Sequence, residues 1–226
     1  MTTVFVGMNG DKAVMASDTG LTTTIDGKLQ TLSYRGHVTP LNDSLLVTTS
    51  GNAVLADSII KELLSQRKRL NADYVAEYFM DKLKDKHGQD RFSINILTRT
   101  RGSFKFIDVN GIEYKDNVKE NDLEEYNLNK SFNSKTELDN LCQEAPYKKE
   151  EFISSKKQSK YYFLKPHIPE IASKIEAAII NDKNLIDIAK YAIRSVALKS
   201  NNVGHTSTPD IWVMKKTGIP IKEKVI

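Results

Sequence analysis

Thr2 could combine a nucleophile and a base on one residue. The chain opens MTTVFVGMNGDKAVMASDTG, and methionine aminopeptidases remove Met1 when a small residue such as threonine follows. Thr2 would then carry a hydroxyl and a free α-amine, and an α-amine with a pKa of about 8 is partly neutral at pH 7 and can take the hydroxyl proton. The alternative is that Thr2 and Thr3 are ordinary strand residues.

A predicted β-hairpin brings a carboxylate close to this threonine. The hairpin consists of residues 3–8, the turn Asn9-Gly10-Asp11 and residues 12–18. A two-residue turn would place Ser17 opposite Thr2, whereas a three-residue loop would place Asp18 there. In both cases Asp18 lies beside the N-terminus, where it could hold the α-amine or a neighbouring cation.

The elements that position these residues alternate between strands and helices. Strands are expected at 20–25 and 28–34 around Asp26-Gly27, at 44–51, at 91–100 and 103–111 around Arg101-Gly102, and at 209–216. Helices are expected at 52–70, from 71 onward, at 169–181 and at 184–200. Residues 115–165 are polar with weak periodicity, which predicts an insertion or a mobile loop. The order predicts an α+β fold in which helices cover the outer faces of two sheets.

Composition favours one domain that spans residues 1–226. The chain is 39% hydrophobic, and its 33 basic and 29 acidic residues are interleaved, so nucleic acid is not an expected partner. The single Cys142 allows no internal disulfide and fits a reducing compartment, and no apolar run could span a membrane. We therefore expect a cytoplasmic protein.

The spacing of histidines and carboxylates indicates no metal site, and no cofactor is expected. His87 and His167 are expected on the surface.

Three stretches of the chain resemble the proteasome β-subunit family. TTVFVGMNGDKAVMASDTGLTTT resembles the family's opening, in which Thr-Thr-x-Val, a hairpin and A-x-D lead into a threonine-rich stretch. HVTPLNDSLLVTTSGNAVLAD resembles the next block, K-[LI]-T-P-x-x-D followed by a strand, Ser-Gly and a helix, and PDIWVMKKTG is similar to the last core strand and turn. The resemblance covers residues 2–64, follows the element order to about 114 and resumes near 168.

The resemblance implies a four-layer αββα sandwich of the N-terminal nucleophile hydrolase type. Thr2 would attack a peptide carbonyl, Asp18 would orient the charged partner, and the N–H of Gly51 would bind the oxyanion. A glycine at this strand-to-helix turn permits close approach of a substrate, and the following helix N-terminus favours negative charge. The family's substrate pocket would be lined here by Leu21, Thr39, Thr49 and Ala53, which suits a small or moderately polar side chain better than a large acidic one.

The chain departs from the family at several supporting positions. The family has a lysine at the head of the K-[LI]-T-P block, where this chain has His37, whose ordinary pKa of about 6.5 would make activity pH-sensitive. Arg35 is the rival for this role, because a hairpin centred on Asp26-Gly27 places it opposite Asp18. The family's Gly-Ser-Gly turn has no clear copy in this chain, and Ser159 is only a guess for its serine. Asn202, with His205 or Thr206, falls nearest to the family's C-terminal Asp and Ser.

Three functional readings follow from the resemblance and these departures. The first is a threonine-type peptidase or a transpeptidase or ligase, with a peptide or protein substrate and an acyl-enzyme at Thr2. The second is a catalytically inactive proteasome-like assembly or binding subunit, and the third is an amidohydrolase acting on a small molecule. The chain could form a ring, as the family does, or a monomer or dimer if residues 115–165 block the ring contacts.

Overall fold

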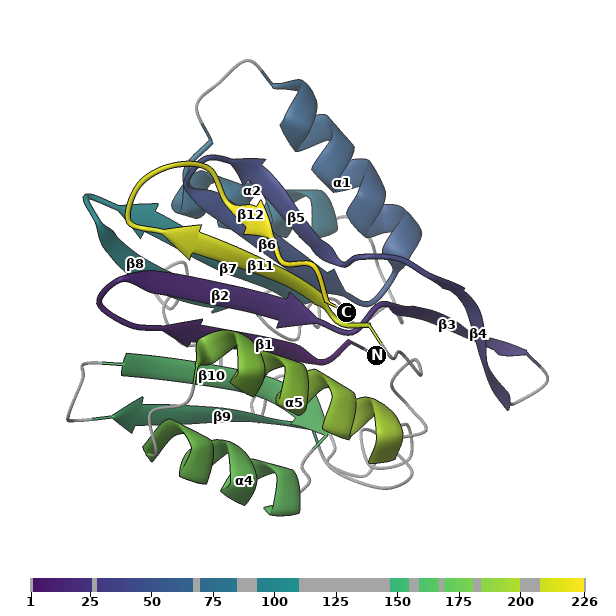
Figure 1. Ribbon diagram of the computed structural model, residues 1–226. Helices are drawn as coiled ribbons and strands as arrows, with labels where there is room; N and C mark the ends of the chain where they lie inside the picture. The colour runs from purple at the N-terminus through teal and green to yellow at the C-terminus, as the bar shows by residue number, and fades with distance from the viewer. Residues whose placement is uncertain are drawn as a thin grey trace.

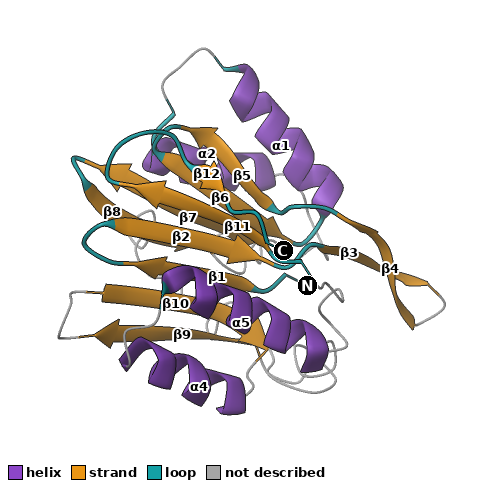
Figure 2. Cartoon of the chain, in the orientation of Figure 1, coloured by secondary structure: helices purple, strands orange, loops and turns teal. Residues whose placement is uncertain are grey.

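The computed structural model describes residues 2–25, 28–66, 70–84, 93–109, 147–154, 159–166, 169–180, 184–199 and 208–225. Within these ranges the strands are β1 (Val4–Met8), β2 (Lys12–Ser17), β3 (Gly20–Ile25), β4 (Lys28–Tyr34), β5 (Val38–Asn42), β6 (Leu45–Ser50), β7 (Ser93–Thr100), β8 (Ser103–Val109), β9 (Tyr147–Ser154), β10 (Ser159–Pro166), β11 (Asp210–Lys215) and β12 (Ile221–Lys222). The helices are α1 (Ala53–Ser65), α2 (Ala72–Lys84), α4 (Pro169–Ile180) and α5 (Leu185–Lys199). Helices and antiparallel strands occupy separate parts of the chain (Figure 2), which confirms the predicted α+β class.

The strands form two sheets and a separate hairpin. One sheet has the order β12-β11-β2-β1-β10-β9, and the other has the order β5-β6-β7-β8. Strands β3 and β4 pair only with each other among the described residues and extend away from the two sheets (Figure 1). This hairpin joins β2 of the first sheet to β5 of the second.

Three apolar clusters hold the sheets and helices together. Alternation along β1 turns Val4 and Val6 toward the second sheet and Phe5 toward α5, as the two-residue period of a strand requires. Helices α1 and α2 pack on the outer face of the β5–β8 sheet, and α4 and α5 pack on the outer face of β1, β2 and β11. The third cluster fills the space between the two sheets.

The first hairpin has a different register from both predicted ones. The N–H of Asn9 donates to the carbonyl of Lys12 (3.0 Å), and the Asn9 side chain accepts from the N–H groups of Asp11 (3.0 Å) and Lys12 (2.9 Å). The turn is therefore centred on Gly10 and Asp11, and Val4 pairs with Ser17. This register brings Asp18 opposite Thr3, so neither Ser17 nor Asp18 lies opposite Thr2.

The second hairpin also differs from its predicted register by one residue. An irregularity between Leu21 and Thr22 shifts the pairing, so that Gly20 pairs with Tyr34. As a result the N–H of Arg35 donates to the carbonyl of Thr19 (2.8 Å). The prediction that Arg35 lies opposite Asp18 is therefore wrong, because it assumed an unbroken ladder.

The polar segment 115–165 is not one insertion or mobile loop, because its second half contains β9 and β10. Strand β10 is antiparallel to β1, with Val4 opposite Leu164 and Met8 opposite Lys160, and β9 forms the edge of the sheet. This register places Ser159 at the Met8 end of β1 and away from Thr2, so the guess that Ser159 supports Thr2 is wrong. Residues 115–146 lie outside the described residues.

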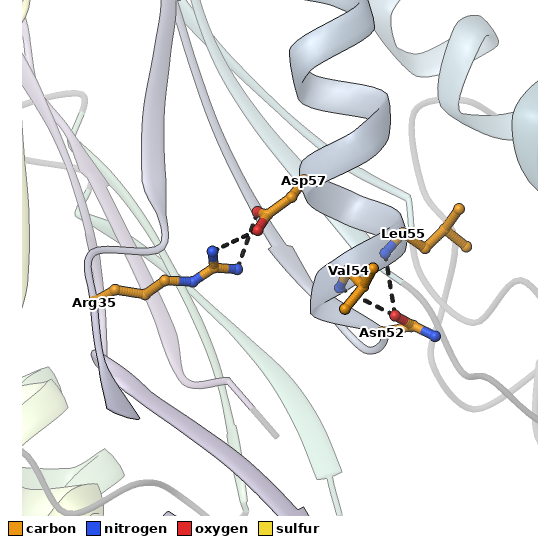
Figure 3. Close-up of polar contacts among 5 residues, drawn as sticks. All are labelled: Arg35, Asn52, Val54, Leu55 and Asp57. Atoms are coloured by element: carbon orange, nitrogen blue, oxygen red, sulfur yellow. Dashed lines mark hydrogen bonds and ion pairs between the residues drawn. The ribbon is translucent and has the colours of Figure 1, made fainter. Parts of the chain in front are cut away.

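The helices match their predicted positions, with one earlier end. Helix α1 ends at Ser65, before the expected end at residue 70, and begins at a cap provided by Asn52, whose side chain accepts from Val54 N and Leu55 N (both 3.1 Å; Figure 3). The tail after Gly218 contains the short strand β12, which pairs with β11. Strand β12 thus forms the edge of the larger sheet beside β11.

Candidate active site

A pocket of about 210 Å³ forms where the two sheets, the β3–β4 hairpin and α1 meet. It is lined by Thr2, Gly20, Leu21, Arg35, Gly36, His37, Thr39, Thr49, Ser50, Gly51, Ala53, Ala56, Asp57 and Ile60. The four residues predicted to form a substrate pocket, Leu21, Thr39, Thr49 and Ala53, all line it. The structure thus brings together Thr2, the predicted oxyanion glycine and both candidates for the lysine position.

His37 is the candidate that contacts Thr2. Thr2 lies two residues before β1 and His37 immediately precedes β5, so the packing of the two sheets brings the two residues together. The Thr2 Oγ1 and His37 Nδ1 atoms are 3.4 Å apart, and the tautomer of His37 decides which of them donates. This distance is long for a hydrogen bond, although such contacts in unliganded sites often shorten when substrate binds.

The imidazole of His37 is neutral at physiological pH. Burial, which penalises the charged form, and then the positive charge of Arg35 lower the pKa of His37 to about 4. The negative charges of Asp210 and Asp57 oppose this shift without reversing it. The prediction of a titration near pH 6.5 is therefore wrong, because an exposed imidazole was assumed and the site buries it.

Asp18 holds the backbone beside Thr2 and does not pair with Arg35. Its side chain is fully buried, and its Oδ1 accepts from the N–H of Thr3 at 2.7 Å. Burial raises the pKa of Asp18 to about 7, although the hydrogen bond from Thr3 favours the ionised form. Asp18 thus fixes the start of β1 through Thr3, and the predicted carboxylate–guanidinium pair is absent.

Arg35 pairs instead with Asp57, a residue that the sequence interpretation missed. The guanidinium Nη1 and Nη2 donate to the two carboxylate oxygens of Asp57 at 2.5 and 3.0 Å (Figure 3). Asp57 lies four residues after Ala53, one helical turn away on the same face of α1. That spacing was the available signal, because any helix that presents Ala53 to a pocket presents residue 57 as well. The pair places two opposite charges on the pocket wall.

Gly51 connects β6 to α1 in a conformation that suits glycine. Its φ of +109° is one that side-chain-bearing residues rarely adopt. The side chain of Asn52 already engages the N–H groups of Val54 and Leu55 in the first turn of α1. Gly51 lines the same pocket as Thr2, and the oxyanion role that the resemblance implies for its N–H stays a prediction.

Asp210 is a second missed residue near the site. It lies at the start of β11, and its Oδ2 accepts from the N–H of Val38 at 2.9 Å. Because Asp210 and Val38 are 172 residues apart in the chain, no local pattern could have connected them. Asp210 belongs to the structure that surrounds His37 without lining the pocket.

Other predicted residues fall outside the part of the chain that the structure describes. These are His87, Cys142, His167, Asn202, His205 and Thr206. Among the described residues, no group of His, Cys, Asp and Glu is arranged to hold a metal ion. In the same residues, no helix is long and apolar enough to cross a membrane.

Comparison of the sequence with protein families and curated proteins identifies no relative. No protein-family model matches the chain, and no curated protein matches it significantly. The case for a function therefore rests on Thr2, His37 and the pocket that they share.

Proposed function

We propose that the chain is an N-terminal-threonine enzyme of the proteasome β-subunit type that acts on peptide bonds through an acyl-enzyme at Thr2. The observation that carries this proposal is the shared pocket, in which Thr2 and Gly51 lie with the four residues expected to bind substrate. The hydroxyl of Thr2 is also 3.4 Å from the Nδ1 atom of His37. A nucleophile, a polar neighbour and an oxyanion donor around one cavity are the elements of an acyl-transfer site.

The three apolar clusters support the finer fold that this proposal requires. One cluster joins α1 and α2 to the β5–β8 sheet, another joins the two sheets to each other, and the last joins the larger sheet to α4 and α5. The resulting order of layers, helices, sheet, sheet and helices, corresponds to the four-layer αββα sandwich of N-terminal nucleophile hydrolases. Here β1 lies inside the larger sheet, between β2 and β10, and Thr2 lies just before the start of this strand.

The first chemical step forms the acyl-enzyme. Once processing makes Thr2 the first residue, its neutral α-amine accepts the hydroxyl proton while Oγ1 attacks the carbonyl carbon of the substrate. The N–H of Gly51 donates to the resulting oxyanion. When the C–N bond breaks, the α-ammonium returns the proton to the departing amine and an ester remains on Thr2.

His37 contributes orientation and does not supply positive charge. Its pKa of about 4 keeps the imidazole neutral in the working range, so it can accept or donate one hydrogen bond to the Thr2 hydroxyl according to its tautomer. Asp18 acts one residue away, because it holds the N–H of Thr3 and so fixes the direction in which Thr2 leaves β1. This division differs from the family, in which a lysine occupies the position of His37.

The second step transfers the acyl group to water or to an amine. Water gives a protease, and an incoming amine gives a transpeptidase or ligase, because the same ester is open to either nucleophile. The wall of the pocket carries small and hydroxyl side chains and the Arg35–Asp57 pair. We expect it to accept small or moderately polar side chains before the scissile bond.

A panel of peptides incubated with and without a competing amine tests this function. Products resolved by mass would be hydrolysed, ligated or both in the wild type, and absent in Thr2→Ala. Thr2→Ser should retain measurable turnover because it keeps the hydroxyl and the amine. Turnover that survives in Thr2→Ala would contradict an acyl-enzyme at Thr2, and a preference for glutamate before the scissile bond would contradict the proposed pocket specificity.

The neutral His37 also favours a second candidate, a non-catalytic assembly or binding subunit. The family's lysine supplies a positive charge that a buried imidazole with a pKa of about 4 does not. Retention of Met1 in the purified protein would favour this candidate, because a blocked amine cannot act as the base. Light scattering bears on assembly, since a ring would have a mass of a dozen or more times 25.5 kDa.

A further inference from the structure

Asp210 is a buried carboxylate that contacts the backbone on one side of His37. Its side chain is only 1% exposed, and its Oδ2 accepts from the N–H of Val38 at 2.9 Å. Asp210 pairs in register with Ser17 on the neighbouring strand β2, so its backbone is fixed within the larger sheet. The carboxylate therefore reaches from one sheet to the first residue of β5 in the other.

The same carboxylate packs against the residue on the other side of His37. A Cβ atom added to Gly36 would lie 2.5 Å from Asp210 Oδ2 and 2.8 Å from its Cγ, closer than a real Cβ atom approaches such groups. Gly36 thus leaves room for the carboxylate. Asp210 consequently fixes both neighbours of His37, one by a hydrogen bond and the other by close packing.

The ammonium of Lys222 completes the environment of this carboxylate. Its Nζ lies 2.7 Å from Asp210 Oδ1, an ionic contact without the alignment of a hydrogen bond. Lys222 belongs to β12, which pairs with β11 through Trp212–Lys222 and Val213–Ile221. A buried carboxylate is costly unless it is paired, so the C-terminal strand supplies a charge that keeps Asp210 in place.

We propose that Asp210 is a positioning residue that holds His37 beside Thr2 through Gly36 and Val38, and that Lys222 of β12 holds Asp210 in turn. The inference rests on the proposed function, because it assigns His37 a place in the reaction of Thr2. It extends that function by making the reactivity of Thr2 depend on the C-terminal residues. Neither Asp210 nor Lys222 lines the pocket, so both act through the segment that carries His37.

Electrostatics around His37 agree with this arrangement. The charged groups that act on its imidazole are Arg35 and the N-terminal ammonium, whose positive charges lower the pKa, and Asp210 and Asp57, whose negative charges raise it. The effect of Asp210 exceeds that of Asp57, and it reaches His37 from β11. Asp210 thus affects both the position and the charge environment of the ring.

Labelling kinetics and NMR together test the proposal on the full-length protein. The variants are Asp210→Ala, Asp210→Asn, which keeps an oxygen to accept from Val38, and Lys222→Met, with Lys224→Met as the matched control on the same exposed tail. A β-lactone that acylates N-terminal threonine gives the maximal rate constant and the half-saturating concentration. Ring resonances of His37, assigned by their loss in His37→Gln, report its environment without requiring activity.

We expect Asp210→Ala to lower the maximal rate constant by about 10- to 100-fold, because small misplacements of a reacting geometry carry costs of this size. The half-saturating concentration should change by less than about twofold, since the pocket wall is untouched. Asp210→Asn should recover much of the rate, Lys222→Met should fall between Asp210→Asn and Asp210→Ala, and Lys224→Met should match the wild type. The His37 resonances should move in Asp210→Ala and Lys222→Met and stay in place in Lys224→Met.

Several results would overturn the proposal. Unchanged His37 resonances and an unchanged rate constant in a folded Asp210→Ala protein would do so, as would equal losses in all four variants. If Asp210→Ala does not fold, Asp210→Asn and Lys222→Met carry the same comparison. A wild type that takes no label would count against Thr2 as a nucleophile, whereas unmoved His37 resonances in Lys222→Met and Asp210→Asn would count against the positioning role.

Discussion

Two buried carboxylates beside Ser17 are stabilised in different ways. Asp18, which follows Ser17 in the chain, accepts from the N–H of Thr3, and burial raises its pKa to about 7. Asp210, which pairs with Ser17 across the sheet, accepts from the N–H of Val38 and also contacts the ammonium of Lys222. The N-terminal strand is thus held by a carboxyl that titrates near neutrality, and the segment of His37 is held by an ion-paired carboxylate.

Replacement of Asp18 should give the largest effect, seen as a change in the pH dependence of stability. A folded pKa above the unfolded value of 3.8 means that the stabilising contribution of Asp18 is complete below pH 3.8 and is lost as the pH rises through about 7. Asp18→Asn removes this titration. The unfolding free energy of Asp18→Asn relative to wild type should therefore rise by roughly 2–3 kcal/mol between pH 5 and pH 8.

Urea denaturation at the two pH values measures this difference. Asp11→Asn provides the control, because Asp11 is an exposed carboxylate in the turn of the same hairpin. An equal free-energy difference at pH 5 and pH 8 would mean that Asp18 does not titrate near neutrality and would contradict the raised pKa of its carboxyl.

Gly36→Ala tests the close packing on the Asp210 side. The added Cβ would meet the carboxylate of Asp210 at 2.5 Å, and overpacking of this kind costs about 1–3 kcal/mol. In the Asp210→Ala background the cost should nearly vanish, because the opposing atoms are gone. Thermal or urea unfolding of the four proteins measures the coupling, and Gly10→Ala, with nothing within 4 Å of the added Cβ, serves as the control. An equal cost in both backgrounds would exclude the proposed contact.

The Arg35–Asp57 pair provides an exposed carboxylate to compare with the buried carboxylates of Asp18 and Asp210. Its side chains are 42% and 38% exposed, so solvent screens the charges and the pair should contribute less than about 1 kcal/mol to stability. A double-mutant cycle with Arg35→Gln and Asp57→Asn measures this coupling by urea denaturation. A coupling well above 1 kcal/mol would show that exposure does not separate this carboxylate from the two buried ones.

His37→Gln should give the smallest effect, namely no change in the midpoint of the pH profile. Because the folded pKa of His37 is lowered, its contribution to the free energy of unfolding is complete above pH 6.5 and is lost as the pH falls through about 4. The imidazole therefore does not titrate between pH 5.5 and 9. Over this range the rate of Thr2 labelling should follow the α-amine, whose pKa is about 8, in both proteins. A wild-type midpoint near pH 6.5 that disappears in His37→Gln would contradict a buried neutral imidazole.

The family resemblance predicted the residues that line the pocket, whereas idealised hairpin geometry did not predict the side-chain pairs around it. Thr49, Gly51 and Ala53 follow one another across a strand-to-helix turn, so their shared location depends on a few residues of chain. Asp57 lies on the same helix as Ala53, but an idealised hairpin predicts Asp18 as the partner of Arg35. The irregularity between Leu21 and Thr22 that shifts this hairpin has no clear sequence signal.

The remaining errors come from side-chain contacts and from long-range pairing. The Asn9 side chain selects a turn centred on Gly10 and Asp11, which moves the register of the first hairpin. Strand β9 has a polar sequence because edge strands tolerate charged residues, and such a sequence predicts a loop in place of a strand. The contact between Asp210 and Val38 required the packed sheets, since burial and partner choice are properties of the tertiary structure.

Intact mass before and after incubation with an epoxyketone or a β-lactone tests the central claim most directly. The account predicts loss of Met1, followed by a single adduct on the wild type and none on Thr2→Ala. Retained Met1, or an adduct of equal extent on Thr2→Ala, would contradict the assignment of Thr2 as the nucleophile.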